Sequence, residues 1–239
     1  MKTYPSLFKS LALLFVLAGL FLASGCAEGE LQRLSRTVER DNAAAVRAEV
    51  TMLSGQMDVR GGATALLDAE FVYNIDSWEP FVDYTVNADQ GRLRVQQPVT
   101  PDVRVSRVRY EWELAFANDV PLDLRVTLGA GKNDLRLSGI QLTNLEVTLG
   151  AGETTLDLTG AWPQSFGVRV RGGAGKANVQ LPRDVGVRVE AGGVLGQLEI
   201  VGLQRQDGAY VNNAYGQSDV TLNVDVQGGV GELVIEVGE

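Results

Sequence analysis

The stretch LRVTLGAG at residues 124–131 recurs as LEVTLGAG at 145–152, 21 residues further along the chain. Further copies follow, with VRVRGGAG at 168–175, VRVEAGG at 187–193 and LNVDVQGG at 222–229. Each copy is followed by a second short segment in which aliphatic and polar residues alternate, such as DLRL at 134–137. Alternation with a period of two is typical of a strand with one buried face.

A repeat of about 20 residues cannot bury its own apolar face, so its copies must stack on one another. The repeats therefore predict an all-β fold, a β-solenoid or β-helix-like stack of coils with 222–229 as the closing copy. Glycine corners supply the positive φ angles that turn the chain between faces. The predicted inward positions are Leu124, Val126, Leu128, Leu145, Val147, Leu149, Val168, Val170, Val187, Val189, Leu222 and Val224.

Outward residues of stacked coils form columns about 4.8 Å apart per rung. One predicted column holds Arg125, Glu146, Arg169 and Arg188, and a second holds Arg136, Asp157, Gln180 and Glu199. Opposite charges on adjacent rungs stabilise a sheet by about 0.2–1 kcal/mol per pair. These columns suit either stacked salt links on a solvated sheet or a ligand-binding face.

The chain divides into four predicted parts. Residues 1–25 form a signal peptide, 26–45 a lipid-anchored tether, 46–115 a less regular N-terminal β domain, and 116–239 the solenoid repeats. Residues 27–45 are polar, with Leu31, Leu34 and Val38 spaced by three and four. That pattern fits a short amphipathic helix or a flexible tether.

The N-terminus has the layout of an export signal. Lys2 and Lys9 precede an apolar run from Leu11 to Leu22, which is too short to span about 30 Å of hydrocarbon. Ala23-Ser24-Gly25 then leads to Cys26, the single cysteine among 239 residues. This ending resembles the lipobox of bacterial lipoproteins, in which the cysteine is diacylated and becomes the new N-terminus.

The lipobox resemblance implies an exported protein held by lipid on Cys26 at the outer face of the cell membrane, or at an outer membrane if the host has one. Several acyl chains anchor a soluble body stably, at about 0.8 kcal/mol per buried CH₂. Lys2 and Lys9 are the only basic residues before Cys26. The mature chain would keep 19 basic and 30 acidic residues, a net charge of −11.

Composition excludes several classes of function. The chain has no histidine, one cysteine and a net charge of −9, which argue against histidine chemistry, a zinc site and nucleic-acid binding. We expect no catalytic residue, metal or cofactor. The acidic residues that would suit a glycoside hydrolase are Asp76, Glu79 and Asp83 around Trp78, and Glu190 with Asp225. Nothing in their spacing makes a pair face across a groove.

Two insertions interrupt the repeats, at residues 74–80 and 204–219. Long loops on a rigid scaffold often carry binding residues. Aromatic and amide side chains suit peptide or glycan contacts, and they also serve as plugs and turn residues. The candidate partner-binding residues are Trp78, Tyr210, Asn212, Asn213 and Tyr215.

A wider resemblance is carried by SGQMDVRGGATALLDAEFVYN at 54–74, Trp78-Glu-Pro80, Tyr84 and GRLRVQQ at 91–97. These motifs resemble the toast-rack N-terminal domain of relatives of the cell-wall-active antibiotic response (Lia-type) regulators. The Gly-Ala-Gly coils are similar to those of putative-adhesin solenoids. The resemblance implies an envelope protein and, in Lia-type regulators, contact with a membrane sensor kinase. Those regulators have several membrane spans, where this chain has a lipoprotein leader.

The sequence therefore predicts a non-catalytic, lipid-anchored envelope protein that binds, scaffolds or senses envelope stress, with another envelope protein as its partner. The alternatives are a solenoid polysaccharide-active enzyme and a self-assembling, adhesin-like surface protein. The oligomeric state is left open by the sequence.

Overall fold

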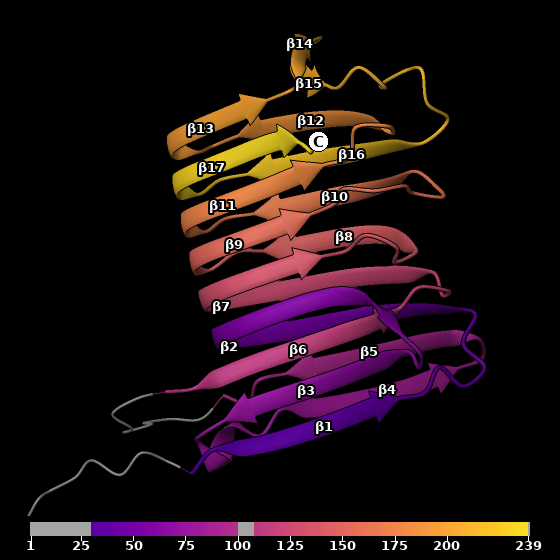
Figure 1. Ribbon diagram of the computed structural model, residues 1–239, viewed down its shortest axis with the longest axis vertical. Coiled ribbons are helices and arrows are strands. Elements are labelled where there is room, and N and C mark those ends of the chain that lie inside the picture. The colour runs from indigo at the N-terminus through magenta and orange to yellow at the C-terminus, as the bar shows by residue number, and fades with distance from the viewer. Residues whose placement is uncertain (1–29, 100–107, 239) are drawn as a thin grey trace, which may run out of the picture.

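The computed structural model describes residues 30–99 and 108–238, which form a column of stacked coils (Figure 1). The first strands are β1 (Gln32–Val38), β2 (Ala45–Ala63), β3 (Leu67–Tyr73), β4 (Phe81–Asn87), β5 (Gln90–Gln96) and β6 (Tyr110–Ala117), with a 3₁₀ turn η1 (Asp76–Trp78). The repeats form β7 (Leu122–Arg136), β8 (Leu142–Thr148), β9 (Ala151–Asp157), β10 (Phe166–Arg171), β11 (Ala174–Leu181), β12 (Gly186–Gly192) and β13 (Leu195–Val201). The remaining strands are β14 (Gln204–Gln206), β15 (Ala209–Val211), β16 (Thr221–Gln227) and β17 (Val230–Val237).

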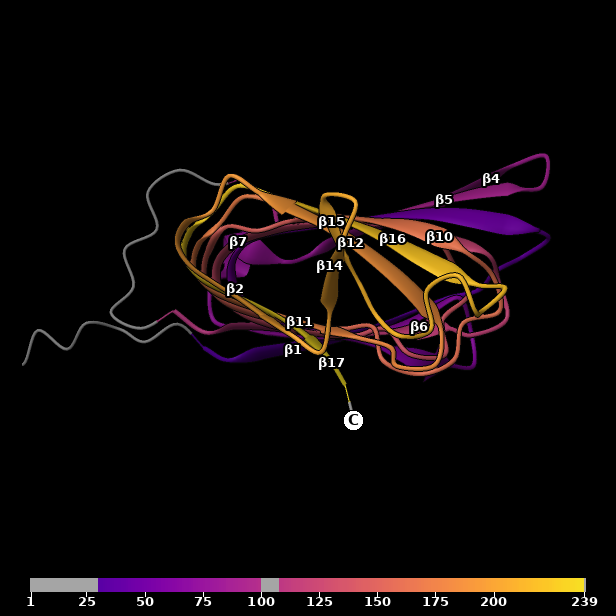
Figure 2. The ribbon, with the colours of Figure 1, turned by 90° about the horizontal axis from the view of Figure 1, so that it is seen from above.

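The coils have two sheet faces joined at a corner (Figure 2). On the β8 face the strands lie in the order β4, β5, β2, β7, β8, β10, β16, β12 and β15. On the β9 face the order is β1, β3, β6, β2, β7, β9, β11, β17 and β13. Because β2 and β7 continue around the corner, each belongs to both faces. The predicted all-β solenoid is confirmed.

The spatial order of the coils differs from their order in the sequence. The last coil, β16–β17, lies between the β10–β11 and β12–β13 coils, so residues 222–229 do not close the stack. Both predicted charge columns are wrong in their last members. Asp225 pairs with Arg169 and with Glu190, while Arg188 lies opposite Asn223.

On the β9 face the predicted column Arg136, Asp157, Gln180 continues to Glu236, not to Glu199. Glu199 lies one column away, opposite Val234. Both errors have one cause, the register. The residues of β12 and β13 that continue the two columns beyond the inserted strands lie 21 residues after Arg169 and Gln180, at Glu190 and Val201, and not 19 residues after them, at Arg188 and Glu199.

A column of six stacked glycines forms the corner: Gly55, Gly131, Gly152, Gly175, Gly231 and Gly196. All six have positive φ, from +126° to +153°. A Cβ on Gly175 would lie 2.2 Å from the carbonyl oxygen of Gly152, and one on Gly131 would lie 1.7 Å from that of Gly55. Only glycine therefore allows adjacent coils to approach this closely at the corner.

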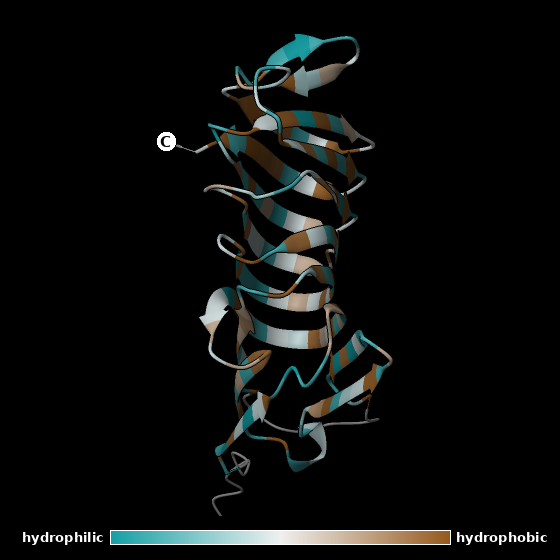
Figure 3. Ribbon diagram, turned by 90° about the vertical axis from the view of Figure 1, so that its right-hand side faces the viewer, coloured by the Kyte–Doolittle hydropathy of each residue, from teal (hydrophilic) through white to brown (hydrophobic). Residues whose placement is uncertain are grey.

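One hydrophobic core fills the space between the two faces. Hydrophobic and hydrophilic bands alternate along the strands (Figure 3), and the predicted inward residues are buried, with Leu149 partly so. The core includes residues on both sides of position 115, such as Leu114 and Leu124. Residues 46–115 and 116–238 thus share one core, since β2 pairs with β7 along both faces.

The segment predicted as a helix or tether contains a strand instead. Residues Gln32–Val38 form β1, which pairs antiparallel with β3 over its whole length. Leu34 and Val38 pack against the core. Pairing with the otherwise open edge of β3 outweighs the weak helical spacing of the leucines, since tertiary contacts commonly override local preference.

We expect Gly175→Ala to lower the free energy of unfolding by about 2–5 kcal/mol, because it combines backbone strain with overpacking. The clash is with backbone, so no rotamer change can relieve it. Gly192→Ala is the matched control, since a Cβ at Gly192 meets nothing within 4 Å. Urea unfolding of residues 27–239, which contain every described strand, measures both variants. Equal effects would contradict the corner explanation.

Candidate functional site

The β8 face carries an alternating ladder of charges along the stack. Its members, in spatial order, are Asp83, Arg94, Glu49, Arg125, Glu146, Arg169, Asp225 and Glu190. Arg94 bonds Asp83 at 2.7 Å, and Arg169 lies 3.8 Å from Asp225. The sign alternates on every rung until Asp225 and Glu190. This surface is therefore largely satisfied by its own ion pairs.

The β9 face has a second ladder, made of Lys132, Glu153, Lys176 and Glu232. The Lys176 ammonium lies 2.8 Å from the Glu232 carboxylate, and this hydrogen bond raises the pKa of Lys176. Lys132 and Lys176 follow Gly-Ala-Gly corners that look superficially like phosphate loops. Lys176 bonds Glu232 on the adjacent strand, and Lys132 is in register with Glu153; both lysines lie within strands, whereas a phosphate loop requires a helix N-terminus.

Of the carboxylates considered for glycoside hydrolysis, Glu190 and Asp225 lie side by side and not across a cleft. Glu190 and Asp225 lie on adjacent strands of the same exposed face, and Arg188 donates to Glu190 at 2.5 Å. Asp76 accepts from Gln32, and Glu79 lies 3.7 Å from Arg36. A hydrolase needs two carboxylates on opposite sides of the scissile bond. The observed arrangement does not supply that geometry.

A groove of about 850 Å³ lies between the β4–β5 hairpin and the neighbouring coils. Arg47, Arg92 and Asp123 contribute its charges. Arg47 bonds Asp123 at 2.8 Å. Burial alone would raise the pKa of Asp123, but hydrogen bonds from Asn144 and Arg47 lower it below its ordinary value. The groove is polar and its central carboxylate is already paired.

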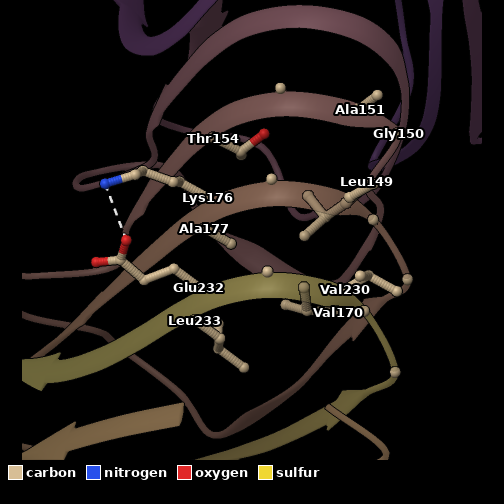
Figure 4. Close-up of a pocket in the computed structure, with 18 of the residues that line it drawn as sticks. Leu149, Gly150, Ala151, Thr154, Val170, Lys176, Ala177, Val230, Glu232 and Leu233 are labelled. Atoms are coloured by element: carbon tan, nitrogen blue, oxygen red, sulfur yellow. Dashed lines mark ion pairs between the residues drawn. The ribbon is translucent and has the colours of Figure 1, made fainter. Parts of the chain in front are cut away.

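A small cavity of about 40 Å³ lies inside the glycine corner. Figure 4 shows Leu149, Val170, Val230 and Leu233 around it, with the Lys176–Glu232 ion pair at its margin. The glycines leave this hollow because they have no side chains to fill it. It is largely apolar and has room for only about three water molecules.

Trp78 lies at the end of the stack that carries β1, β3 and β4, here called the proximal end (Figure 1). Its ring packs edge-on against Tyr110 at 5.3 Å, and the Tyr110 hydroxyl donates to the Trp78 carbonyl at 2.8 Å. Burial raises the pKa of Tyr110. These contacts close the proximal end of the core.

The other candidate residues lie at the opposite, distal end, on the hairpin β14–β15 and the loop after it. The structure therefore separates Trp78 from Tyr210, Asn212, Asn213 and Tyr215. Tyr210 and Tyr215 are half-buried, and Asn213 is exposed and accepts a bond from Gln204. Cys26 lies outside the described residues.

Asn212 is buried, and its amide holds the loop to the stack. Its Oδ1 accepts from the Val187 amide at 3.0 Å, and its Nδ2 donates to the carbonyls of Pro182, Arg183 and Val185 at 3.1, 3.3 and 2.8 Å. All polar atoms of this side chain are engaged within the protein. The insertion therefore has a structural anchor at Asn212 and exposed polar residues around it.

The edge of β13 carries exposed apolar residues that the sequence pattern alone does not reveal. Leu195, Leu198 and Val201 of this strand are 70%, 37% and 45% exposed, and the neighbouring Val230 is 59% exposed. Among the described residues, β13 pairs with β17 alone. The distal end thus combines an apolar strand edge with a polar hairpin.

We expect Asn212→Ala to destabilise the protein by about 2–4 kcal/mol, because it orphans one buried N–H and three carbonyls. Asn213→Ala, one residue further, should change the stability by less than about 0.5 kcal/mol. Thermal unfolding gives both values, and limited proteolysis reports loosening of residues 204–220. A cost for Asn213→Ala as large as that for Asn212→Ala would contradict this assignment.

In the parts of the chain that the structure covers, no helix has the length and apolar character to cross a membrane. Within 30–99 and 108–238 no group of three His, Cys, Asp or Glu side chains is placed to hold a metal ion. No functionally curated protein matches the chain at a significant level.

Among solved structures, a putative cell adhesion protein from Clostridium sporogenes is similar to this chain, with a TM-score of 0.80 and 25% identity over 87% of this chain and all of that one. A putative adhesin from Bacteroides fragilis matches at 10% identity and a TM-score of 0.34, over 86% of this chain and 97% of its own. The family model described as the N-terminal domain of toast_rack, DUF2154, matches residues 27–180. This match covers more than half of the chain and lies on both sides of position 115. The chain therefore belongs to the toast-rack family.

Proposed function

We propose that this chain is a non-catalytic, lipid-anchored protein of the cell envelope that binds a protein partner through its distal end. The observation that carries the proposal is the position of the unsatisfied surface. The ladders on both faces pair their own charges, whereas the distal end presents the exposed β14 residues and the apolar edge of β13.

The direction of the chain supports this arrangement. The lipobox resemblance at Cys26 implies an anchor just before β1, and β1 lies at the proximal end (Figure 1). Successive rungs are about 4.8 Å apart, so the coils hold the distal end roughly 30 Å beyond the proximal coil. An anchored molecule would therefore present its distal end away from the membrane.

The similar structure from C. sporogenes supports a binding role, because it is described as a putative cell adhesion protein and is covered over its full length. A polysaccharide-active enzyme is less well supported, since Glu190 and Asp225 lie side by side on one exposed face. The resemblance to Lia-type regulators makes a membrane sensor kinase one partner to test.

We expect Cys26→Ser to abolish lipid labelling and to release the protein from the membrane fraction, because the anchor depends on the thiol. Metabolic labelling with a palmitate analogue, followed by carbonate extraction of membranes, measures both effects. Ala27→Ser is the control and should remain labelled. A Cys26→Ser protein that stays in carbonate-washed membranes would overturn the proposed anchor.

The distal end should be required for partner capture. We expect crosslinking pull-down from intact cells, with and without a cell-wall antibiotic, to recover an envelope protein. The triple variant Gln204→Ala, Arg205→Ala, Gln206→Ala should lose most of that protein, since all three residues of β14 are exposed.

The control is Arg33→Ala with Ser35→Ala, on exposed positions of β1 at the proximal end. It should leave capture intact. Loss of capture in the β1 variant and not in the β14 variant would place the binding surface at the proximal end and contradict the proposal. Leaving Asn212 unchanged in both variants keeps the loop attached.

A further inference from the structure

Of the four strands that end the coils, the chain covers two fully and a third in part. At the proximal end, β4 covers β5, and β3 with β1 covers β6. At the distal end, β15 pairs antiparallel with β12 at Arg188 and Val189. The fourth strand, β13, has a partner on one edge alone in the described parts of the chain. Within 30–99 and 108–238, no strand pairs with the second edge of β13.

The open edge lacks the features that usually protect such strands. Natural edges are blunted by lysine, proline, bulges or a covering loop. The seven residues of β13 read LGQLEIV, with one charge at Glu199 and neither proline nor lysine. Leu198 lies opposite buried Leu233, and Ile200 lies opposite buried Ile235 on β17. Both residues therefore continue the core-facing rows of the β9 face. Another strand added here would extend that core by one rung.

We propose that the occupant of this edge is the β13 strand of a second copy, added antiparallel about a two-fold axis at Leu198. Because Leu198 is the middle residue of Leu195–Val201, all seven residues then find a partner. Leu198 faces its own copy, Leu195 faces Val201, Gly196 faces Ile200, and Gln197 faces Glu199. Apolar residues thus oppose apolar residues or glycine, and the one carboxylate opposes an amide.

Charge selects this register over its neighbours. Moving the two-fold axis to Glu199 would place two carboxylates directly opposite each other, which destabilises a sheet. Moving it to Gln197 would leave Ile200 and Val201 without partners on the other strand. The strand is therefore complementary to itself in the register centred on Leu198.

The two-fold pairing places the two proximal ends at opposite ends of the dimer. In the hairpin, β14 pairs with β15 alone and β15 pairs with β14 and β12, so neither strand of the hairpin pairs with β13. If the chain is anchored at Cys26, as the proposed function requires, paired copies bridge two membrane surfaces that face each other. The contact would be homotypic adhesion in which each molecule contributes one strand.

A seven-residue edge is small beside a standard protein interface, so we expect a weak, concentration-dependent dimer. Many anchored copies on each surface would strengthen it through multivalency. Each body is acidic, and salt screens repulsion between like charges. The dimer should therefore strengthen as the salt concentration rises.

Sedimentation of residues 27–239 over a range of concentrations tests the pairing. We expect Leu198→Lys to weaken the dimer by at least about tenfold, because it puts two lysines opposite each other. Leu53→Lys is the matched control, since Leu53 is 42% exposed and lies on β2, away from the edge. Circular dichroism confirms that both variants remain β-rich. A monomer at every concentration, or equal weakening by both variants, would overturn the proposal.

Two further variants test the register. Gln197→Lys should tighten the dimer through an ion pair with Glu199 of the second copy, and Gln197→Glu should weaken it. Leu198→Cys should form a disulfide-linked dimer on oxidation, because residues directly opposite in antiparallel strands meet the distance that a disulfide needs. Gln197→Cys should crosslink far less. The register would be overturned by a weaker dimer with Gln197→Lys than with Gln197→Glu. It would also be overturned by more crosslinking with Gln197→Cys than with Leu198→Cys.

Vesicle tethering separates this inference from the proposed function. Vesicles carrying nickel-chelating lipids, loaded with residues 27–239 through an N-terminal polyhistidine tag, should cluster with the unaltered chain and not with Leu198→Lys. This assay does not depend on Cys26. Clustering together with failed lipid labelling in cells would overturn the anchor and keep the pairing. Labelling together with unclustered vesicles would overturn adhesion through β13 and keep the anchor.

Discussion

The glycine column at the corner is the constraint on which the rest of the structure depends. Six glycines from Gly55 to Gly196 stack in register, and a Cβ on five of them would lie about 2 Å from the carbonyl of the glycine on the next rung. Because every coil must turn at this point, the register of the β8 face is tied to that of the β9 face. A one-residue slip would put a side chain at the corner and send the buried rows to the outside.

The charge ladders follow from that fixed register. Once the corners align, Glu49, Arg125, Glu146 and Arg169 can only lie on successive rungs, and their signs alternate. Exposed ion pairs contribute little each, typically 0–1 kcal/mol, so burial of the Leu and Val rows supplies most of the stability. The ladders do not decide the order of the coils, since Glu190 would give Arg169 the same opposite charge that the inserted Asp225 supplies.

The parts of the fold that the sequence could predict are the local ones. Strands and corners are encoded within each repeat, so LEVTLGAG at 145–152 is sufficient to predict both. The order of coils is not local, because the copies at 187–193 and 222–229 have the same alternation and corner glycines wherever they stack. Nor could the exposure of Leu198 be predicted, because QLEI at 197–200 has the same alternation as NVQL at 178–181. The two differ only in whether another rung lies above.

Asn212 was identifiable from its insertion, but its burial depends on carbonyls of residues 182–185.

The covered and open edges also determine what kind of assembly the fold permits. Continuous stacking of solenoids into filaments needs an open edge at each end of the molecule. Here the proximal end is covered, since β4 and β1 add antiparallel strands to β5 and to the β6–β3 pair. In the described parts of the chain, β15 covers β12 at Arg188 and Val189, and β13 keeps an apolar edge without a partner strand. In the proposed antiparallel pair, the β13 edge of each copy is covered by the β13 strand of the other. No β13 edge is then left to bind a third molecule, so assembly stops at the dimer. A repetitive fold that would otherwise be prone to polymerise is thereby limited to a closed pair, and the same limit places the two N-terminal strands as far apart as the dimer allows.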